Sequence, residues 1–247
     1  MRTLKLTVSY DGTTLVGWQR QAAGVSVQGL LEEALGRLEG GPVTVHGAGR
    51  TDAGVHALGQ VASAQVTAAH PVHVIARAVN ACLPPEVRVV DVEETRADFH
   101  ARFSARSKTY RYVIRNAAIV SPFERAYVWQ VPDALDHEAM RHGAAALVGT
   151  HDFAGFRSTG SDTTSTTRTI TRSEFISDDD RTRLVYEIAG DGFLRHMVRA
   201  IVGTLVETGR GQRPVASIAD LLAGGSRSDA GMTAPPQGLF LVRVDYD

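Results

Sequence analysis

Residues 43–66, VTVHGAGRTDAGVHALGQVASAQV, contain two apolar runs separated by a glycine-rich bend. The runs at 43–46 and 59–66 predict strands, because β-branched and small apolar residues dominate them. Three glycines surround the sequence Arg50-Thr51-Asp52 and permit tight backbone geometry there. The bend therefore presents a cation and a carboxylate between two strands. From the bend alone, a structural turn in which Asp52 caps backbone amides is as good an interpretation as a functional loop.

The elements around this bend complete a β-α-β-β-α-β order. Residues 3–9 alternate as a strand, and Ser26 is a plausible N-cap for a helix through residue 38. Pro71 suits the first turn of a helix that reaches about residue 80, and residues 87–92 form an apolar strand. This order predicts a ferredoxin-like unit, in which helices cover one face of an antiparallel sheet.

A similar order recurs after about residue 105. We expect strands at 110–115, 169–176, 183–189 and 238–246, and helices at 137–147, 193–207 and 217–222. The predicted fold class is α+β: two ferredoxin-like units, residues 1–105 and 106–247, joined into a large mixed, mainly antiparallel sheet with helices on one face. The hydroxyl-rich residues 157–169 predict a surface loop, and Asp178, Asp179 and Asp180 predict the tip of a hairpin.

Composition places the chain among globular proteins. It has 247 residues, 43% of them hydrophobic, and a net charge of −1. No run of 18 apolar residues is present, and the N-terminal residues lack a long apolar segment. We therefore expect no membrane span and no signal peptide, and we expect a cytoplasmic location. The single cysteine, Cys82, excludes an internal disulfide framework and argues against a cysteine-built metal site.

Basic residues are concentrated between residues 96 and 115. This stretch contains six arginines and lysines, one aspartate and four interleaved aromatic residues. Cations with aromatic rings are typical of surfaces that bind phosphates and stack on bases, although a solvated basic strand has the same pattern. The bend lacks the glycine and lysine pattern of nucleotide-binding loops, and the nine histidines lack metal-ligand spacing. We therefore expect no metal and no nucleotide cofactor.

Six blocks carry a resemblance that covers nearly the whole chain. They are residues 10–21 (YDGTTLVGWQRQ), 48–61 (AGRTDAGVHALGQV), 98–114 (DFHARFSARSKTYRYVI), 151–157 (HDFAGFR), 192–205 (GFLRHMVRAIVGTL) and 238–246 (GLFLVRVDY). In content and order they resemble the TruA-type tRNA pseudouridine synthases. The resemblance implies the pseudouridine synthase fold and the conversion of uridine to pseudouridine at tRNA positions 38, 39 and 40, in the anticodon stem and loop. This reaction needs no cofactor.

The resemblance also implies roles for individual residues. Asp52 matches the catalytic carboxylate, and Arg199 matches an arginine that pairs with it and favours its ionised form. Tyr110 matches a catalytic tyrosine that stacks on the target base, and Leu239 matches the aliphatic residue on the other side of that base. Arg50 matches the arginine that takes the place of a flipped-out uridine. From the residues alone, we expect three further arginines to contact phosphates: Arg102, Arg106 and Arg111.

The expected partner is the anticodon arm of tRNA, and the family resemblance further implies a homodimer. A non-catalytic RNA-binding or chaperone protein of the same fold is the alternative, and Asp52 distinguishes the two. If Asp52→Asn preserves tRNA binding and abolishes tritium release from C5-labelled uridine, the protein is the isomerase.

Overall fold

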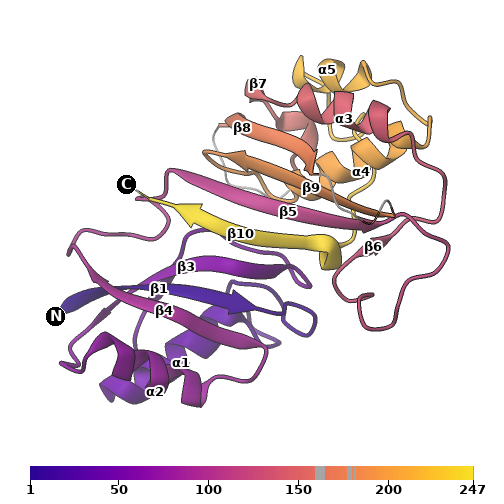
Figure 1. The fold of residues 1–247 in the computed structure, drawn as a ribbon. Coiled ribbons are helices and arrows are strands. Elements are labelled where there is room, and N and C mark those ends of the chain that lie inside the picture. Colours follow the sequence, from indigo (N-terminus) through magenta and orange to yellow (C-terminus); the bar gives the residue numbers. More distant parts are fainter. Residues whose placement is uncertain (159–164, 177–179, 181, 247) are drawn as a thin grey trace. The chain divides into compact units, whose positions relative to one another are not determined.

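A computed structural model describes residues 1–158, 165–176, 180 and 182–246 (Figure 1). The chain divides into two compact units, Met1–Arg106 with Phe240–Asp247 and Ser107–Leu239. We expected one boundary at residue 105, with all later residues in the second unit. The last eight residues instead cluster with the first unit, because the final strand pairs there.

The first unit contains four main strands in the order β4-β1-β3-β10. The strand β1 (Arg2–Tyr10) is antiparallel to both β3 (His56–Val66) and β4 (Val87–Thr95). The strand β10 (Leu239–Asp245) runs parallel to β3, with Phe240 opposite His56. A short strand, β2 (Val45–Gly47), is antiparallel to β3. The two strands predicted around the glycine-rich bend are therefore paired, as hairpin partners.

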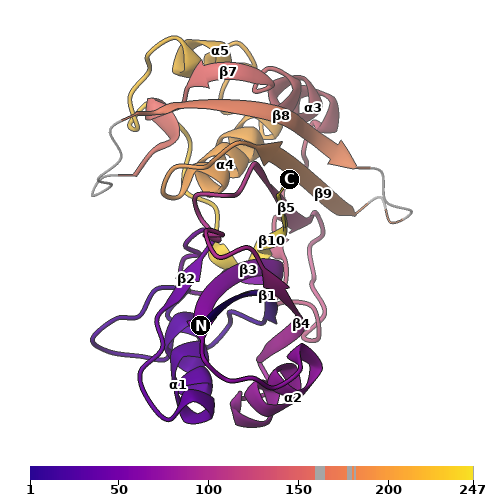
Figure 2. The ribbon, with the colours of Figure 1, turned by 90° about the vertical axis from the view of Figure 1, so that its left-hand side faces the viewer.

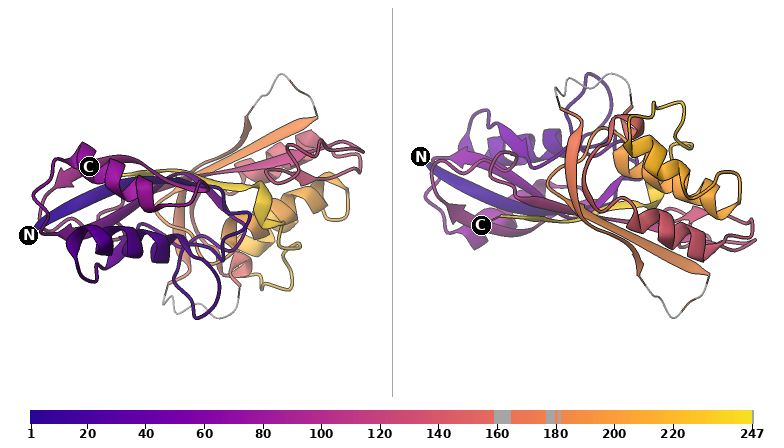
Figure 3. Two further views of the ribbon diagram at one scale, coloured as in Figure 1. Left: turned by 90° about the horizontal axis from the view of Figure 1, so that it is seen from below. Right: turned by 90° about the horizontal axis from the view of Figure 1, so that it is seen from above.

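Two helices, α1 (Val27–Glu39) and α2 (Val72–Cys82), lie side by side on one face of these strands (Figures 2 and 3). The predicted cap of α1 is confirmed, since the Ser26 side chain accepts a hydrogen bond from the backbone N–H of Gly29. Gly40 ends the helix in the left-handed conformation, with φ of 70°. Alternate residues of β1, from Leu4 to Tyr10, are buried and supply the core under the sheet.

The second unit contains an antiparallel sheet in the order β5-β9-β8-β7. Its strands are β5 (Ser107–Arg115), β7 (Gly149–Asp152), β8 (Thr167–Ile176) and β9 (Arg183–Gly190), with β6 (Trp129–Gln130) parallel to β5. The helices are α3 (His137–Ala145), α4 (Met197–Gly209) and α5 (Ser217–Leu222), and two 3-10 turns occur at Ala154–Phe156 (η1) and Pro236–Gly238 (η2).

The predicted α+β class with mainly antiparallel strands is confirmed. Two short strands, β6 and β7, were not expected, because runs of two and four residues carry too little periodic signal. The helix predicted from residue 193 begins at Met197 instead, since residues 193–196 form a turn in which His196 has φ of 60°. Residues 159–164 of the predicted surface loop, and Asp178 and Asp179 of the predicted hairpin tip, lie outside the described residues.

No helix in the part of the chain that the structure describes is both long and apolar enough to cross a membrane. The single cysteine, Cys82, is exposed and has a free thiol.

Candidate active site

The bend between β2 and β3, residues 48–55, is called the Asp52 loop below. It closes on a turn in which the Val55 N–H donates to the Asp52 carbonyl oxygen at 3.1 Å, and Gly54 supplies the required positive φ of 77°. At the start of the loop, Ala48 N–H donates to the Val61 carbonyl at 2.8 Å. The fully buried Gln60 side chain donates to the Gly49 carbonyl at 2.9 Å. These bonds fix the backbone on which the half-buried Asp52 stands.

A second segment, residues 10–18, braces the loop from the side. The hydroxyls of Tyr10 and Thr51 lie 2.8 Å apart, and Trp18 N–H donates to the Thr51 carbonyl at 3.1 Å. Burial raises the pKa of Tyr10 to about 12, so its phenol is neutral and remains available for this bond. The segment approaches so closely that a Cβ on Gly12 would lie 2.1 Å from the Val55 carbonyl oxygen. This contact gives a physical reason for Gly12 in the block YDGTTLVGWQRQ.

Two further residues stand at the ends of the loop. Arg50 is exposed, and its Nε donates to Gln19 Oε1 at 3.0 Å. His56, at the start of β3, is only 1% exposed; its Nδ1 accepts from Gly12 N–H at 3.0 Å, and its ring stacks on Phe240 with centroids 4.8 Å apart. Sequence analysis gave His56 no specific role, and in the structure it ties β3 to both the bracing segment and β10.

In the second unit, Tyr110 and Tyr112 point to the same face of β5, since they are two residues apart on a strand. Tyr110 is 7% exposed, and the Phe193 ring meets it edge-on at 5.0 Å. The Tyr112 hydroxyl donates to the Pro235 carbonyl at 2.7 Å. Burial raises the pKa of Tyr112, an effect opposed by the positive charge of Arg199 nearby.

Arg199 projects from the first turns of α4 and is bound to the segment that leads to β10. Its Nε donates to the Ala234 carbonyl at 2.7 Å, while its own backbone carbonyl accepts from Ala234 N–H at 3.0 Å. Five residues later, Leu239 is 5% exposed, and the adjacent Gly238 lies flat against the Tyr112 ring, where a Cβ would be only 2.6 Å away. Tyr112 therefore lies near Arg199 and packs against Gly238, the residue before Leu239.

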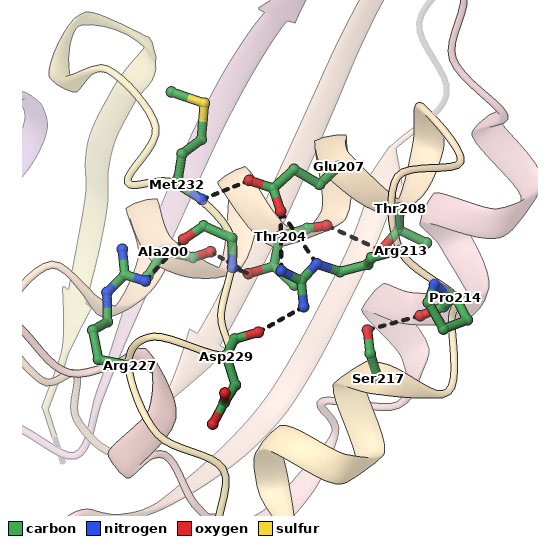
Figure 4. A network of polar contacts seen from close by, with 11 residues as sticks. Ala200, Thr204, Glu207, Thr208, Arg213, Pro214, Ser217, Arg227, Asp229 and Met232 are labelled. Carbon is green, nitrogen blue, oxygen red and sulfur yellow. Dashed lines mark hydrogen bonds and ion pairs between the residues drawn. The ribbon is translucent and has the colours of Figure 1, made fainter.

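A polar network on α4 fixes the segment 229–235, which is called the strap below (Figure 4). Gly231 N–H donates to Thr204 Oγ1 at 2.9 Å, and Met232 N–H donates to Glu207 Oε1 at 2.8 Å. Two nitrogens of Arg213, Nε and a terminal nitrogen, donate to Glu207 Oε2 at 3.2 and 3.0 Å. The other terminal nitrogen donates to the Asp229 carbonyl at 2.7 Å. The strap in turn positions the carbonyl that binds the Arg199 guanidinium.

The expected phosphate-binding arginines have different surroundings. Arg102 and Arg106 are exposed on the first unit. Arg111, on β5, directly opposes Glu187 on β9, and both its Nε and a terminal nitrogen donate to Glu187 Oε1, at 3.0 and 2.7 Å. Glu187 is 5% exposed and also pairs with Arg172. Arg111 therefore has an internal structural partner, and its contact with phosphate stays a prediction.

The sequence-predicted residues divide between the two units. Asp52 and Arg50 share one loop of the first unit, while Tyr110, Arg199 and Leu239 belong to the second. The ion pair between Asp52 and Arg199 stays a prediction. Among the residues that the structure describes, no group of three histidine, cysteine or acidic side chains could hold a metal ion. The sequence gives no sign of the roles of Glu207 and Arg213, which lie outside the six blocks, or of Thr204, which lies in the block 192–205.

Comparisons with known proteins agree on one family. The chain matches the sequence profile described as tRNA pseudouridine synthase over residues 6–104 and 144–247. It is 46% identical, over its full length and 97% of the relative, to tRNA pseudouridine synthase A of Syntrophotalea carbinolica. It is 48% identical to tRNA pseudouridine synthase A of Solibacter usitatus, over all of both chains. The non-catalytic alternative finds no support among these relatives.

A search of solved structures adds a more distant likeness. A chain in the crystal structure of the archaeal box H/ACA sRNP Nop10-Cbf5 complex matches 96% of this chain and 47% of its own length, with 10% identity and a TM-score of 0.38.

Proposed function

The chain belongs to the tRNA pseudouridine synthase family, and from this premise we propose that it converts uridine to pseudouridine at positions 38, 39 and 40 of the tRNA anticodon arm. The observation that carries the proposal is the Asp52 loop. Its sequence matches the family's most specific motif, and its backbone is fixed from both sides by residues 10–18 and by Gln60. A carboxylate on a rigid backbone suits a reaction that depends on the orientation of its groups.

The reaction is an isomerisation whose atoms and electrons balance within the nucleotide. The bond from N1 to C1′ breaks, the uracil turns while it is held, and C5 bonds to C1′. The proton leaves C5, and N1 ends with a proton, so no external oxidant or group donor is needed. Asp52 supplies the carboxylate. It acts either as a nucleophile toward the uracil or the sugar, or as the group that accepts a proton from the sugar.

The other residues bind and orient the uridine. Arg199 pairs with Asp52 and favours its ionised form. Tyr110 stacks on one face of the uracil and Leu239 contacts the other, so that the detached base is held but can still rotate. Arg50, on the exposed side of the loop, takes the place of the uridine that leaves its stack. Arg102, Arg106 and Arg111 contact phosphates. The effect of Arg199 on Tyr112 and the packing of Gly238, next to Leu239, on the same ring support a joint role for Arg199 and Leu239.

The decisive experiment replaces Asp52 and a matched aspartate of the same unit. We expect Asp52→Asn to bind tRNA and to release no tritium from C5-labelled uridine, because a neutral amide cannot act as nucleophile or base. Asp91→Asn, at an exposed position on β4, is the control and should behave as the wild type. Undiminished tritium release from Asp52→Asn would refute the assignment.

A second experiment separates the role of Arg50 from simple phosphate binding. Arg50→Ala should lose turnover more than tRNA affinity, because the arginine acts when the base leaves its stack. Arg37→Ala, an exposed position at the end of α1, is the control. Equal losses of turnover and affinity would make Arg50 a phosphate clamp.

We also propose that the protein acts in the cytoplasm as a homodimer in which one tRNA contacts both subunits. The family resemblance supports the dimer. Light scattering should then give about twice the chain mass of 26.5 kDa, and a monomer at assay concentration would contradict it.

A further inference from the structure

A column of rings lies on the surface of the first unit, and none of the three ring residues was assigned a role above. The His46 and His100 ring centroids are 4.7 Å apart, and those of His100 and Phe103 are 4.4 Å apart. The guanidinium carbon of Arg102 lies 5.5 Å from the Phe103 centroid. Phe103, at the outer end, is 77% exposed. We call His46, His100, Phe103 and Arg102 the ring column.

The fold imposes the exposure of Phe103. Ala101 is fully buried; its N–H donates to Ser63 Oγ at 3.0 Å, and its carbonyl accepts from the Tyr246 hydroxyl at 2.7 Å. The turn that follows is closed by Ser104 N–H, which donates to the His100 carbonyl at 2.9 Å. A turn anchored in this way holds the Phe103 ring outward before any ligand arrives, which lowers the entropic cost of binding.

His100, the middle ring of the column, is held in its neutral form. His100 Nδ1 accepts from Arg102 N–H at 3.1 Å, an acceptor role that requires this nitrogen to carry no proton. Burial, with smaller contributions from His46 and Arg102, lowers the pKa of His100. The central ring of the column, His100, is therefore neutral, and Arg102 supplies a positive charge beside it.

Other exposed apolar residues lack these features. Phe123 is 93% exposed and Ile119 is 85% exposed, and among the described residues the Phe123 ring has no ring pair or cation–π contact. Isolated apolar side chains of this kind are normal on protein surfaces. An aromatic ring backed by two more rings and flanked by a cation is a different object, since it combines a stacking face with a charge that attracts phosphate.

We propose that the ring column is a stacking platform for an unpaired base of the bound tRNA, with the base on Phe103 and Arg102 at the neighbouring phosphate. The proposal rests on tRNA as the substrate and adds Phe103, His100 and His46 to its contacts. Sequence-tolerant stacking of single-stranded bases on aromatic rings is a common mode of RNA recognition.

The position of the column favours the RNA that occupies the Asp52 loop. His46 lies on β2, the strand that leads into that loop at Ala48. Six residues separate His46 from Asp52 along the chain, so their Cα atoms are at most about 21 Å apart. A tRNA whose uridine reaches Asp52 therefore passes close to the column.

Charge argues against a second copy of this chain as the occupant. A two-fold interface would bring the same surface of both copies together. Arg102 and Arg106 are both exposed there, while the acidic Asp98 is already paired with Arg96 at 3.1 Å. Like charges would meet across such an interface, whereas the phosphates of an RNA would be attracted.

Fluorescence tests the contact directly, because the chain has two tryptophans and both Trp18 and Trp129 are buried, at 2% and 9% exposure. The Phe103→Trp variant adds an exposed indole, and a base that stacks on it should quench its emission when unmodified tRNA transcript is added. Phe123→Trp is the matched control and should be quenched no more than the wild type. Equal quenching of the two variants, or equal quenching of Phe103→Trp by blunt double-stranded RNA, would overturn the proposal.

Affinity and rate give an independent test. Phe103→Ala should weaken tRNA binding about tenfold, while Phe103→Tyr and Phe123→Ala bind normally. Tritium release at subsaturating tRNA should fall by about the same factor in Phe103→Ala and stay at the wild-type level in Phe123→Ala, because Phe103 contributes to tRNA binding and Phe123 does not. Unchanged tRNA affinity of Phe103→Ala, whether the variant is a dimer or a monomer, would overturn the proposal. Failure of the proposed isomerisation would be seen separately, as no tritium release from the wild type.

Discussion

The Asp52 loop and the strap beside Arg199 are held in place by different forces. Apart from the bond from the exposed Arg50 to Gln19, the contacts named above for the loop join neutral groups: backbone amides and carbonyls, the Gln60 amide and the hydroxyls of Tyr10 and Thr51. The strap is held by charged side chains, with Glu207 and Arg213 at the centre of the network. A loop fixed by close packing tolerates no added atoms, whereas a strap fixed by charges and polar bonds is sensitive to the loss of a partner.

The largest effect is expected where packing is tightest. Gly12→Ala should destabilise the protein by about 3 kcal/mol, because the new methyl group meets the backbone of Val55 at 2.1 Å and backbone cannot move aside as a side chain can. Urea unfolding measures the loss, and tritium release should fall with it as the Asp52 loop shifts.

Gly41→Ala is the control for this substitution. A Cβ at Gly41 meets nothing within 4 Å, so the change should be nearly neutral. If Gly12→Ala were as stable and as active as this control, close packing would not be what fixes the loop.

A smaller effect is expected from one hydroxyl under the strap. Thr204→Val should cost about 2 kcal/mol, because the buried N–H of Gly231 loses its acceptor and no water can replace it. Thr208→Val removes an equally buried hydroxyl of the same helix, one that only donates to the Thr204 carbonyl. This control should change stability by less than about 0.5 kcal/mol. Equal losses in urea unfolding would show that the hydroxyl does not hold the strap.

The sequence was informative where the signal is local. The Ser26 cap, the two strands around the bend and the helix at Pro71 all depend on neighbours within a few residues. The last strand was predicted at about its observed position but was placed in the second unit, because its pairing with β3 joins residues 184 positions apart, Phe240 and His56. Such non-local pairing leaves no trace in periodicity.

The candidate site divides in the same way. Asp52 and Arg50 stand out in a motif of unusual composition, whereas the function of Gly12 becomes clear only when Val55 is seen against it. Arg111 has the composition of a phosphate ligand, and only the register that places it opposite Glu187 reveals its ion pair. Partners supplied by another strand or helix cannot be identified from one residue's neighbours in sequence.

Salt distinguishes the two regions. Glu207→Gln should destabilise the protein by about 1.5 kcal/mol at low ionic strength, since it replaces a charged hydrogen-bond acceptor that binds two nitrogens of Arg213. The deficit should shrink in 1 M NaCl, because both side chains are 19% exposed and salt screens such a pair. The deficit of Gly12→Ala should not change with salt. Urea unfolding in both buffers measures the loss of unfolding free energy in Glu207→Gln. A loss that does not change with salt would contradict the view that an ion pair holds the strap.

The smallest effect concerns the neutral bond between Tyr10 and Thr51. Tyr10→Phe should cost about 1 kcal/mol at pH 9, where both hydroxyls are intact. Burial raises the pKa of Tyr10 from 10.0 to about 12, so above pH 10 the unfolded chain loses this proton first and the folded state is penalised. At pH 11 the penalty is about 1.4 kcal/mol, and it falls on the wild type alone.

The advantage of the wild type over Tyr10→Phe should therefore disappear near pH 11. The other buried tyrosines are common to both proteins, so their titration cancels in the difference between the two unfolding free energies. A difference that stays constant between pH 9 and 11 would mean that Tyr10 titrates normally and that the brace beside the Asp52 loop is open to water. A difference that vanishes would show a brace that is neutral, dry and insensitive to pH across the physiological range, which is the property that separates it from the charged strap.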